Sequence, residues 1–339
     1  MSYYFKLPIY AELTDPQKAV LDEPNAVAIT GGPGTGKSVV SLWRHIRNHS
    51  IGTKKSLILT YTKTLERYLS ECAAKENAEA GRAVKRTTGW SFDSSEHIDE
   101  IIVDEAQDNN NDCYTYLKRF VETVSYGADE QQILYPEHSS SEEQLLSLFP
   151  DNKFYELDEN FRNSYEIMQF TSAALPKKLI SNLVMEALQR DRSTGIKPKC
   201  LVTGGIWDKR TKGMIDIINE FESDTHNIGI FLPKKSQVRN CHALLLSKGV
   251  KCTMYIHDGE EILDISGVHV TTFKSAKGIE FDTVILPDFQ DWKLNIQNLN
   301  IVEEKDYYVA FTRAKRNLFL ISSTSVLGID PTTYEIENL

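Results

Sequence analysis

The sequence is poor in cysteine, and its cysteines are not arranged for a metal site or a disulfide framework. There are five among 339 residues, an odd number without a CxxC pair. None has a histidine at metal-ligand spacing. We therefore expect reduced thiols, and the sequence argues against a zinc module or a disulfide-rich secreted domain.

Long apolar runs are also absent. No stretch of 18 apolar residues occurs, and the chain does not open with a basic and then an apolar segment. Hydrophobic residues at 41% and charged residues at 25% are typical of a globular protein. The length suits two domains of about 150 residues each. These features predict a cytoplasmic protein with no membrane partner.

Basic residues are scarce in residues 91–160, where 18 acidic residues accompany three basic ones. Residues 177–212 reverse this balance, with nine Lys or Arg against three acidic residues, although the net charge of the whole chain is −10. A nucleic acid would favour this basic segment, where Lys209, Arg210 and Lys212 are the candidate contacts. The alternative from charge alone is a solvated surface without a partner.

A glycine-rich segment lies between the apolar run 26–29 and an amphipathic run that begins at Val39. It fits the pattern GxxxxGK[ST] of a phosphate-binding loop between a strand and a helix. Backbone N–H groups of such a loop bind phosphate oxygens, the lysine reaches the β- and γ-phosphates, and the hydroxyl takes a Mg²⁺ position. The segment predicts a site for ATP and Mg²⁺ that is formed by Gly31, Gly32, Pro33, Gly34, Thr35, Gly36, Lys37 and Ser38.

Two acidic residues follow the aliphatic run 101–103. A buried strand of this kind delivers carboxylates to the edge of a parallel sheet where the phosphate loop lies. Asp104 is the candidate Mg²⁺ ligand, and Glu105 is the candidate base that orients and deprotonates the attacking water.

Four polar or aromatic residues are weaker candidates for ligand contacts. Gln17, in a short helix predicted from Leu13 to Leu21, has an amide that can pair with the N6 and N7 edge of adenine. Tyr61 and Thr62 end a predicted strand, and Trp90 lies in a polar and aromatic loop. Tyr61, Thr62 and Trp90 are candidates for nucleic-acid contacts. For Tyr61 and Thr62, the alternative is an ordinary strand end without a ligand.

With the phosphate loop and Gln17, Asp-Glu-Ala-Gln at 104–107 resembles the superfamily 1 helicases of the UvrD/Rep type, and later segments follow that family's motif order. Residues 126–133 resemble motif III, 157–164 motif IV, 270–281 motif V and 307–315 motif VI. The resemblance implies an α/β fold of two RecA-like P-loop NTPase lobes. Each lobe would be a mainly parallel sheet flanked by helices, with the ATP cleft between the lobes.

The resemblance also implies roles for particular residues. Gln131 would be a γ-phosphate sensor, and Arg162 and Arg313 would contact the γ-phosphate from the second lobe. This agrees with phosphoryl chemistry, in which arginines supplied across a cleft stabilise the charge that develops during hydrolysis. The remaining roles, in motif V, are Gly278 near the γ-phosphate, Glu280 near the ribose, and Thr272 and Lys277 facing nucleic acid or the cleft.

The sequence departs from the family pattern in several places. Residues 66–81, rich in Ala and Glu, are predicted to form one helix. The span 62–101 that contains it leaves no room for a large accessory domain such as relatives have, and neither does the short stretch between Tyr255 and motif V. Ala128 stands where the family usually has Asp, and an aromatic-Arg-Gly segment is replaced by residues 134–138. This loss would weaken stacking on single strands unless Tyr135 substitutes. Lys274 stands where a His is common and would contact a phosphate instead.

We expect a first lobe at 1–150, with the phosphate loop and acidic box, and a second lobe at 151–339, with the arginine motifs and the basic segment. Residues 143–150 are expected to form the link between the lobes. The first functional hypothesis is an ATP-dependent translocase or helicase on single-stranded nucleic acid, with DNA favoured by family analogy. The second is an ATP-gated switch or binding subunit with a protein partner in a multi-component system, such as anti-phage defence or a mobile element. A kinase fits less well, because the acidic box and two arginine motifs suit activation of water.

Overall fold

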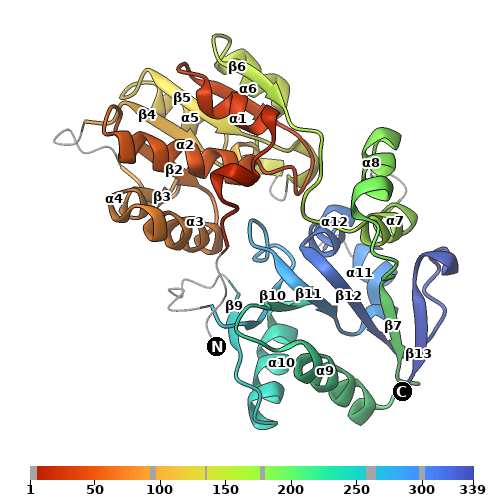
Figure 1. Ribbon diagram of the computed structural model, residues 1–339. Coiled ribbons are helices and arrows are strands. Elements are labelled where there is room, and N and C mark those ends of the chain that lie inside the picture. The colour runs from red at the N-terminus through yellow and green to blue at the C-terminus, as the bar shows by residue number, and fades with distance from the viewer. Residues whose placement is uncertain (1–5, 92–96, 134–135, 176–179, 257–264, 298–301) are drawn as a thin grey trace. The chain divides into compact units, whose positions relative to one another are not determined.

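In a computed structural model, the chain forms two compact units, one ending at Phe161 and the other beginning at Arg162. The structure describes residues 6–91, 97–133, 136–175, 180–256, 265–297 and 302–339. Each unit is built on a parallel sheet flanked by helices (Figure 1). This confirms the predicted α/β fold class.

The first unit has a six-stranded sheet in the order β3-β2-β4-β5-β1-β6, with every neighbouring pair parallel. Its strands are β1 Val27–Thr30, β2 Ser56–Thr60, β3 Val84–Arg86, β4 Glu100–Val103, β5 Thr123–Gly127 and β6 Lys153–Glu156. Its α-helices are α1 Asp15–Asp22, α2 Lys37–Ile51, α3 Lys63–Glu76, α4 Ala78–Arg82, α5 Asn111–Leu117 and α6 Glu142–Leu148. Its 3₁₀ helices are η1 Tyr10–Glu12, η2 Ala106–Asp108, η3 Glu130–Gln132 and η4 Pro136–His138.

Helices cover both faces of this sheet, because the central strands are apolar on both sides. In β4, Ile101 and Val103 pack in a core with Leu117 of α5 and Leu145 of α6. Ile102 faces the opposite way and packs in a core built from α2, α3 and α4. This alternation explains why β4 is a continuous aliphatic run and why it delivers the next residue, Asp104, to the sheet edge.

The second unit has a seven-stranded parallel sheet in the order β13-β7-β12-β11-β8-β10-β9. Its strands are β7 Lys199–Val202, β8 Ile228–Leu232, β9 Thr253–Tyr255, β10 Val268–Thr272, β11 Phe281–Leu286, β12 Ala314–Ser322 and β13 Glu335–Asn338. Its α-helices are α7 Tyr165–Ala174, α8 Asn182–Arg192, α9 Trp207–Phe221, α10 Lys235–Ser247, α11 Trp292–Gln297 and α12 Glu304–Thr312. Its 3₁₀ helices are η5 Phe289–Asp291 and η6 Pro331–Thr333.

Three predicted boundaries were wrong. The division at 150/151 falls too early, because Lys153–Glu156 forms an edge strand that pairs with β1 in the first sheet. The predicted link at 143–150 is mostly helical, since α6 covers Glu142–Leu148. The single helix predicted over 66–81 is two helices, because Asn77 is extended and its side chain accepts hydrogen bonds from the first turn of α4.

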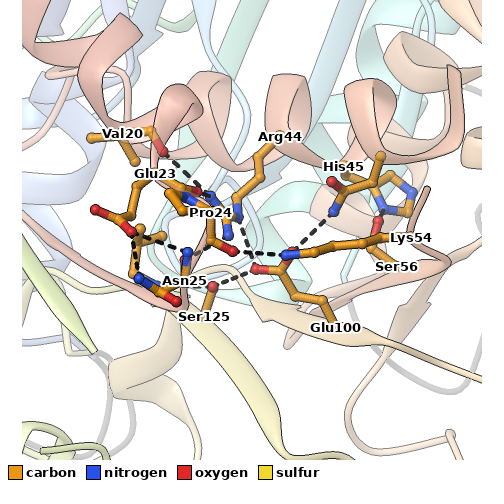
Figure 2. A network of polar contacts seen from close by, with 12 residues as sticks. Val20, Glu23, Pro24, Asn25, Arg44, His45, Lys54, Ser56, Glu100 and Ser125 are labelled. Atoms are coloured by element: carbon orange, nitrogen blue, oxygen red, sulfur yellow. Dashed lines mark hydrogen bonds and ion pairs between the residues drawn. The ribbon is translucent and has the colours of Figure 1, made fainter. Parts of the chain in front are cut away.

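A buried ion pair lies at the amino edge of the first sheet, where β4 begins (Figure 2). Arg44 of α2 donates from Nε to Glu100 Oε1 at 2.8 Å, and the two side chains are 4% and 0% exposed. Arg44 also donates to the carbonyls of Val20, Glu23 and Asn25 before β1. The pair therefore joins α2, β4 and the segment that leads into β1.

We expect Arg44→Met to destabilise the protein by about 3–5 kcal/mol, because the Glu100 carboxylate remains buried without its cation. Arg67→Met is the matched control. Arg67 pairs with Glu71 on the surface of α3, with side chains 43% and 34% exposed, so its loss should cost under about 1 kcal/mol. Urea unfolding of both variants measures the difference, and equal costs would contradict it.

Candidate nucleotide-binding site

The phosphate loop joins the carboxyl end of β1 to α2, in the predicted place. Gly31, Gly34 and Gly36 have φ values of 143°, 74° and 90°, which L side chains rarely adopt. A Cβ at Gly31 would lie 2.1 Å from the Leu157 carbonyl oxygen, and one at Gly36 would lie 2.4 Å from Gln17 Nε2. Both glycines are therefore required by the backbone and by close neighbours.

Gln17 lies against this loop but uses its amide within the protein. Its Nε2 donates to the Thr35 carbonyl at 3.1 Å, and its Oε1 accepts from the Thr14 backbone N–H. The side chain is 5% exposed. Gln17 thus braces the phosphate loop from the start of α1, a role that the sequence did not predict, and its contact with adenine stays a prediction.

Lys37, the first residue of α2, folds back over the loop. Its Nζ donates to the Gly31 carbonyl at 2.6 Å and to the Gly32 carbonyl at 2.8 Å. It also lies 3.7 Å from Asp129 Oδ2. The Lys37 ammonium group is therefore held beside the loop by the carbonyls of Gly31 and Gly32 and by Asp129. A phosphate oxygen can take the place of these carbonyls.

Asp104 lies at the carboxyl end of β4 and hydrogen-bonds to Ser38. In the part of the chain that the structure describes, its buried Oδ2 has no hydrogen-bond partner. Burial and the neighbouring Glu105 carboxylate raise the pKa of Asp104. An orphaned carboxylate oxygen beside a hydroxyl fits a hard cation such as Mg²⁺, which binds through one or two protein oxygens and substrate phosphates.

Glu105 follows in a left-handed backbone conformation, with φ of 54°. This is uncommon for a non-glycine residue and clusters at functional sites. The side chain is 9% exposed, and Gln107 Nε2 donates to its Oε2 at 2.5 Å. The turn thus directs Glu105 differently from Asp104, so that the two adjacent acids have different partners.

Asp129 is a site residue that the motif comparison missed. Besides Lys37, it accepts from the Gln131 backbone N–H at 3.0 Å and from Gln132 Nε2 at 2.5 Å. Its own N–H donates to Gln107 Oε1 at 3.0 Å. The residue that follows Ala128 therefore places a buried carboxylate beside Lys37.

The predicted sensor, Gln131, is exposed, whereas its neighbour Gln132 is 3% exposed and joined to Asp129. The role of Gln131 stays a prediction. The sequence signal for Asp129 was an acid three residues before a glutamine, in the segment that follows β5.

In the second unit, the arginine of motif IV is paired with an acid of motif V. Arg162 Nε donates to Glu280 Oε2 at 2.8 Å, and Lys315 Nζ lies 3.3 Å from Glu280 Oε1. Burial would raise the pKa of Glu280, but these two cations together lower it to about 2. Glu280 is therefore ionised at neutral pH and holds both cations near the start of β11.

Arg313 of motif VI is 1% exposed and lies between α12 and β12. Its Nε donates to the Val309 carbonyl at 3.3 Å. Gly278 has φ of 86° and turns the chain before Glu280. The structure thus brings Arg162, Glu280 and motif VI together within one unit.

Several predicted nucleic-acid residues have structural roles. Thr62 caps α3 by accepting from the Leu65 N–H at 3.2 Å. Tyr61 is half-buried, and burial raises the pKa of its phenol. Trp90 packs edge-to-face on Tyr116, with ring centroids 6.3 Å apart. Tyr135 lies outside the described residues.

The motif V candidates differ in exposure. Thr272 is 9% exposed and its hydroxyl donates to Ser275 Oγ at 3.0 Å, closing the turn after β10. Lys277 is fully buried, whereas Lys274 is half-buried. Lys274 is therefore the most exposed of these three side chains, and its contact with a phosphate stays a prediction.

Two of the three candidate phosphate contacts in the basic segment, Lys209 and Arg210, are hydrogen-bonded within the protein. Arg210 is 8% exposed and makes two hydrogen bonds to Asp288, at 2.6 and 2.7 Å. Lys209 donates to the Leu339 carbonyl, and Lys212 is exposed. Arg210 is thus not an accessible phosphate contact as predicted, because it is folded into an internal ion pair.

These features define a class. A phosphate loop after β1, an acidic pair after β4 and a second parallel sheet that carries two arginine motifs are the parts of a P-loop NTPase with two RecA-like lobes. Residues 24–192 match the model of the Schlafen group 3 DNA/RNA helicase domain, and residues 253–325 match that of the UvrD-like helicase C-terminal domain. Both models describe helicase domains, and together with the mimivirus relative below they support a superfamily 1 helicase, in agreement with the motif order.

Individual relatives agree with this family. The chain is 26% identical over 273 residues to "Putative ATP-dependent DNA helicase R568" of Acanthamoeba polyphaga mimivirus, a match that covers 71% of this chain and 38% of that protein. It is 39% identical over 61 residues to the RecBCD enzyme subunit RecB of Chlamydia pneumoniae, covering 18% of this chain and 6% of that subunit. The chain thus spans less than two fifths of either relative's length.

Among solved structures, S. cerevisiae Dbp5 bound to RNA and ADP BeF3 matches with a TM-score of 0.57 at 12% identity, over 97% of this chain and 90% of that chain. At this identity the likeness shows the fold. In the described residues, we find no helix with the length and apolar character that spanning a bilayer requires.

Proposed function

We propose that this chain is an Mg²⁺-dependent ATP hydrolase that moves along single-stranded nucleic acid. The observation that carries the proposal is the cluster at the carboxyl edge of the first sheet. There Lys37 lies over the phosphate loop, Ser38 hydrogen-bonds to Asp104, and one buried oxygen of Asp104 has no hydrogen-bond partner among the described residues. These groups suit a triphosphate and its cation.

Each residue has a role in this proposal. Lys37 and the loop N–H groups bind the β- and γ-phosphates, and Glu105 accepts a proton from the attacking water. Ser38 and Asp104 would hold Mg²⁺, which neutralises phosphate charge when it is bound. Arg162 and Arg313 stabilise the charge of the transferring phosphoryl group when the two lobes close, and hydrolysis then reopens them.

Support for a nucleic-acid track comes from the helicase models, and support for DNA comes from the name of the mimivirus relative. Among the basic candidates, Lys212 is exposed, and Lys274 and Lys209 are half-buried. Each closure of the lobes would advance the strand by one step.

A specific observation favours a second function, an ATP-gated switch that acts on a protein partner. Predicted nucleic-acid residues are turned inward, since Arg210 is bound to Asp288 and Lys277 is fully buried. A short helicase core of this kind would change its conformation with ATP without unwinding a duplex. This alternative retains the same hydrolytic site.

The deciding experiment measures ATP hydrolysis by the full chain alone and with single-stranded DNA, single-stranded RNA or duplex DNA, with Glu105→Gln as the blank. We expect strong stimulation by single-stranded DNA. Stimulation by RNA alone would replace DNA as the track. ATP binding with turnover that no polymer alters would favour the switch, and absence of ATP binding would contradict both proposals.

A further inference from the structure

Asn163, which directly follows Arg162, connects the two arginine motifs. It is fully buried. Its Nδ2 donates to the Thr312 carbonyl at 3.1 Å and to the Ala314 carbonyl at 2.7 Å. These carbonyls lie on either side of Arg313, and a side-chain amide nitrogen has two N–H donors, so both are used here.

The peptide of Arg313 is held from other directions as well. Its carbonyl accepts from the Phe281 N–H at 2.9 Å, and its N–H donates to the Val309 carbonyl at 3.1 Å. Asn163 therefore adds two side-chain hydrogen bonds to a segment whose backbone is already hydrogen-bonded to α12 and to β11. Together these bonds fix the point from which the Arg313 side chain extends.

The backbone of Asn163 is also held by a hydrogen bond. Its carbonyl accepts from Arg192 Nε, at the end of α8, at 3.1 Å. The segment that follows α8 is held by Glu166 of α7, whose buried carboxylate accepts hydrogen bonds from Ser193, Thr194 and Gly195. A displacement of Asn163 would thus be transmitted to α7, α8 and the Arg313 turn alike.

Ion pairs of Glu280 also join the two motifs, in addition to the hydrogen bonds of the Asn163 amide. Glu280 lies between Arg162, the residue before Asn163, and Lys315, two residues after Arg313. The two motifs are therefore joined once by hydrogen bonds to backbone and once by ion pairs. Both connections lie within the second unit.

We propose that Asn163 is a positioning residue for ATP hydrolysis, which locks Arg162 and Arg313 into one body so that both reach the phosphates in the same step. This rests on the proposed function. The residue type is decisive, because Asp would place a carboxylate against two carbonyl oxygens, Ser offers one donor, and Leu offers none. The effect belongs to catalysis rather than to ATP affinity, since ground-state binding rests on the phosphate loop.

The chain offers a matched control in Asn152 of the first unit. Its Nδ2 also bridges two backbone carbonyls, those of Val27 at 3.2 Å and Val124 at 2.8 Å. These bonds lie at the amino side of the first sheet, away from the phosphate loop. Asn152→Leu therefore removes the same two hydrogen bonds without touching either arginine motif.

The test compares Asn163→Leu with Asn152→Leu in the full chain, using circular dichroism for folding, fluorescent ATP binding for Kd, and steady-state hydrolysis for kcat. We expect Asn163→Leu to lower kcat by about 10–100-fold with Kd within about three-fold of wild type. Asn152→Leu should keep kcat within about two-fold. An equal kcat for the two variants, or a change confined to Kd, would overturn the proposal.

Two further variants keep the test decisive if Asn163→Leu does not fold. Asn163→Ser retains one donor and should give an intermediate kcat, whereas wild-type kcat would overturn the proposal. In the Asn163→Ser background, Arg313→Ala should lower kcat by less than it does in wild type, because the two residues act together. Wild-type protein without ATP turnover would instead refute the proposed function itself.

Discussion

Glu105→Gln is expected to lower kcat for ATP hydrolysis by about 10²–10⁴-fold, the usual contribution of a general base. The change is isosteric, so the side-chain oxygen at 105 can still accept the 2.5 Å hydrogen bond from Gln107 Nε2. The left-handed backbone at this position, with φ of 54°, is equally strained in both forms. ATP binding should therefore persist while turnover is lost, which would trap the ATP-bound state.

The matched control is Glu142→Gln. Glu142 is a half-buried carboxylate of the same unit that accepts from the Glu130 N–H at 3.3 Å, and it has no role in the proposed chemistry. Binding of a fluorescent ATP analogue and single-turnover hydrolysis separate affinity from chemistry. If Glu105→Gln hydrolyses ATP at the rate of the control, a different group activates the water.

The residues of the ATP site could be predicted from sequence because each lies in a short contiguous segment at the end of a strand. A phosphate loop carries its own glycines, lysine and hydroxyl, so Gly31, Lys37 and Ser38 were recognisable without any distant partner. Asp104 and Glu105 were recognisable because three aliphatic residues precede them. The residues that each of these segments needs for its chemistry are contiguous in the sequence, and so the sequence pattern alone identifies them.

The errors came from contacts between distant residues. Nothing in residues 153–156 shows that they pair with Val27–Thr30, and so the boundary was placed too early. The burial of Arg210 depends on Asp288, 78 residues later. Asn163 meets its partners about 150 residues away, and its two donors could not be assigned before the fold was known. Sequence periodicity does not encode such pairings.

A local signal was also overlooked. Asn77 is a favoured helix N-cap residue, and it divides a run that was predicted as one helix. Gly81 is required there, since a Cβ would lie 2.6 Å from the Cβ of Ala74. This glycine lets α4 pack closely against α3.

Lys37→Met is expected to lower kcat by about 10²–10³-fold or more, because the loss of even one neutral hydrogen-bond donor at a developing negative charge has an effect of this size. ATP affinity should fall as well, because Nζ, now on the Gly31 and Gly32 carbonyls, is the cation that the phosphates would meet. Lys63→Met is the matched control, since Lys63 likewise opens a helix, α3, after a strand of the same sheet.

The same substitution should affect stability through Asp129. Lys37 is the cation 3.7 Å from the Asp129 carboxylate, which is 3% exposed, so its removal should cost about 1–3 kcal/mol. Adding Asp129→Asn removes that charge and should restore the urea midpoint without restoring turnover. Recovery of stability alone would show that Lys37 both neutralises Asp129 and acts on ATP. Retained hydrolysis in Lys37→Met would remove the assignment of the phosphate loop.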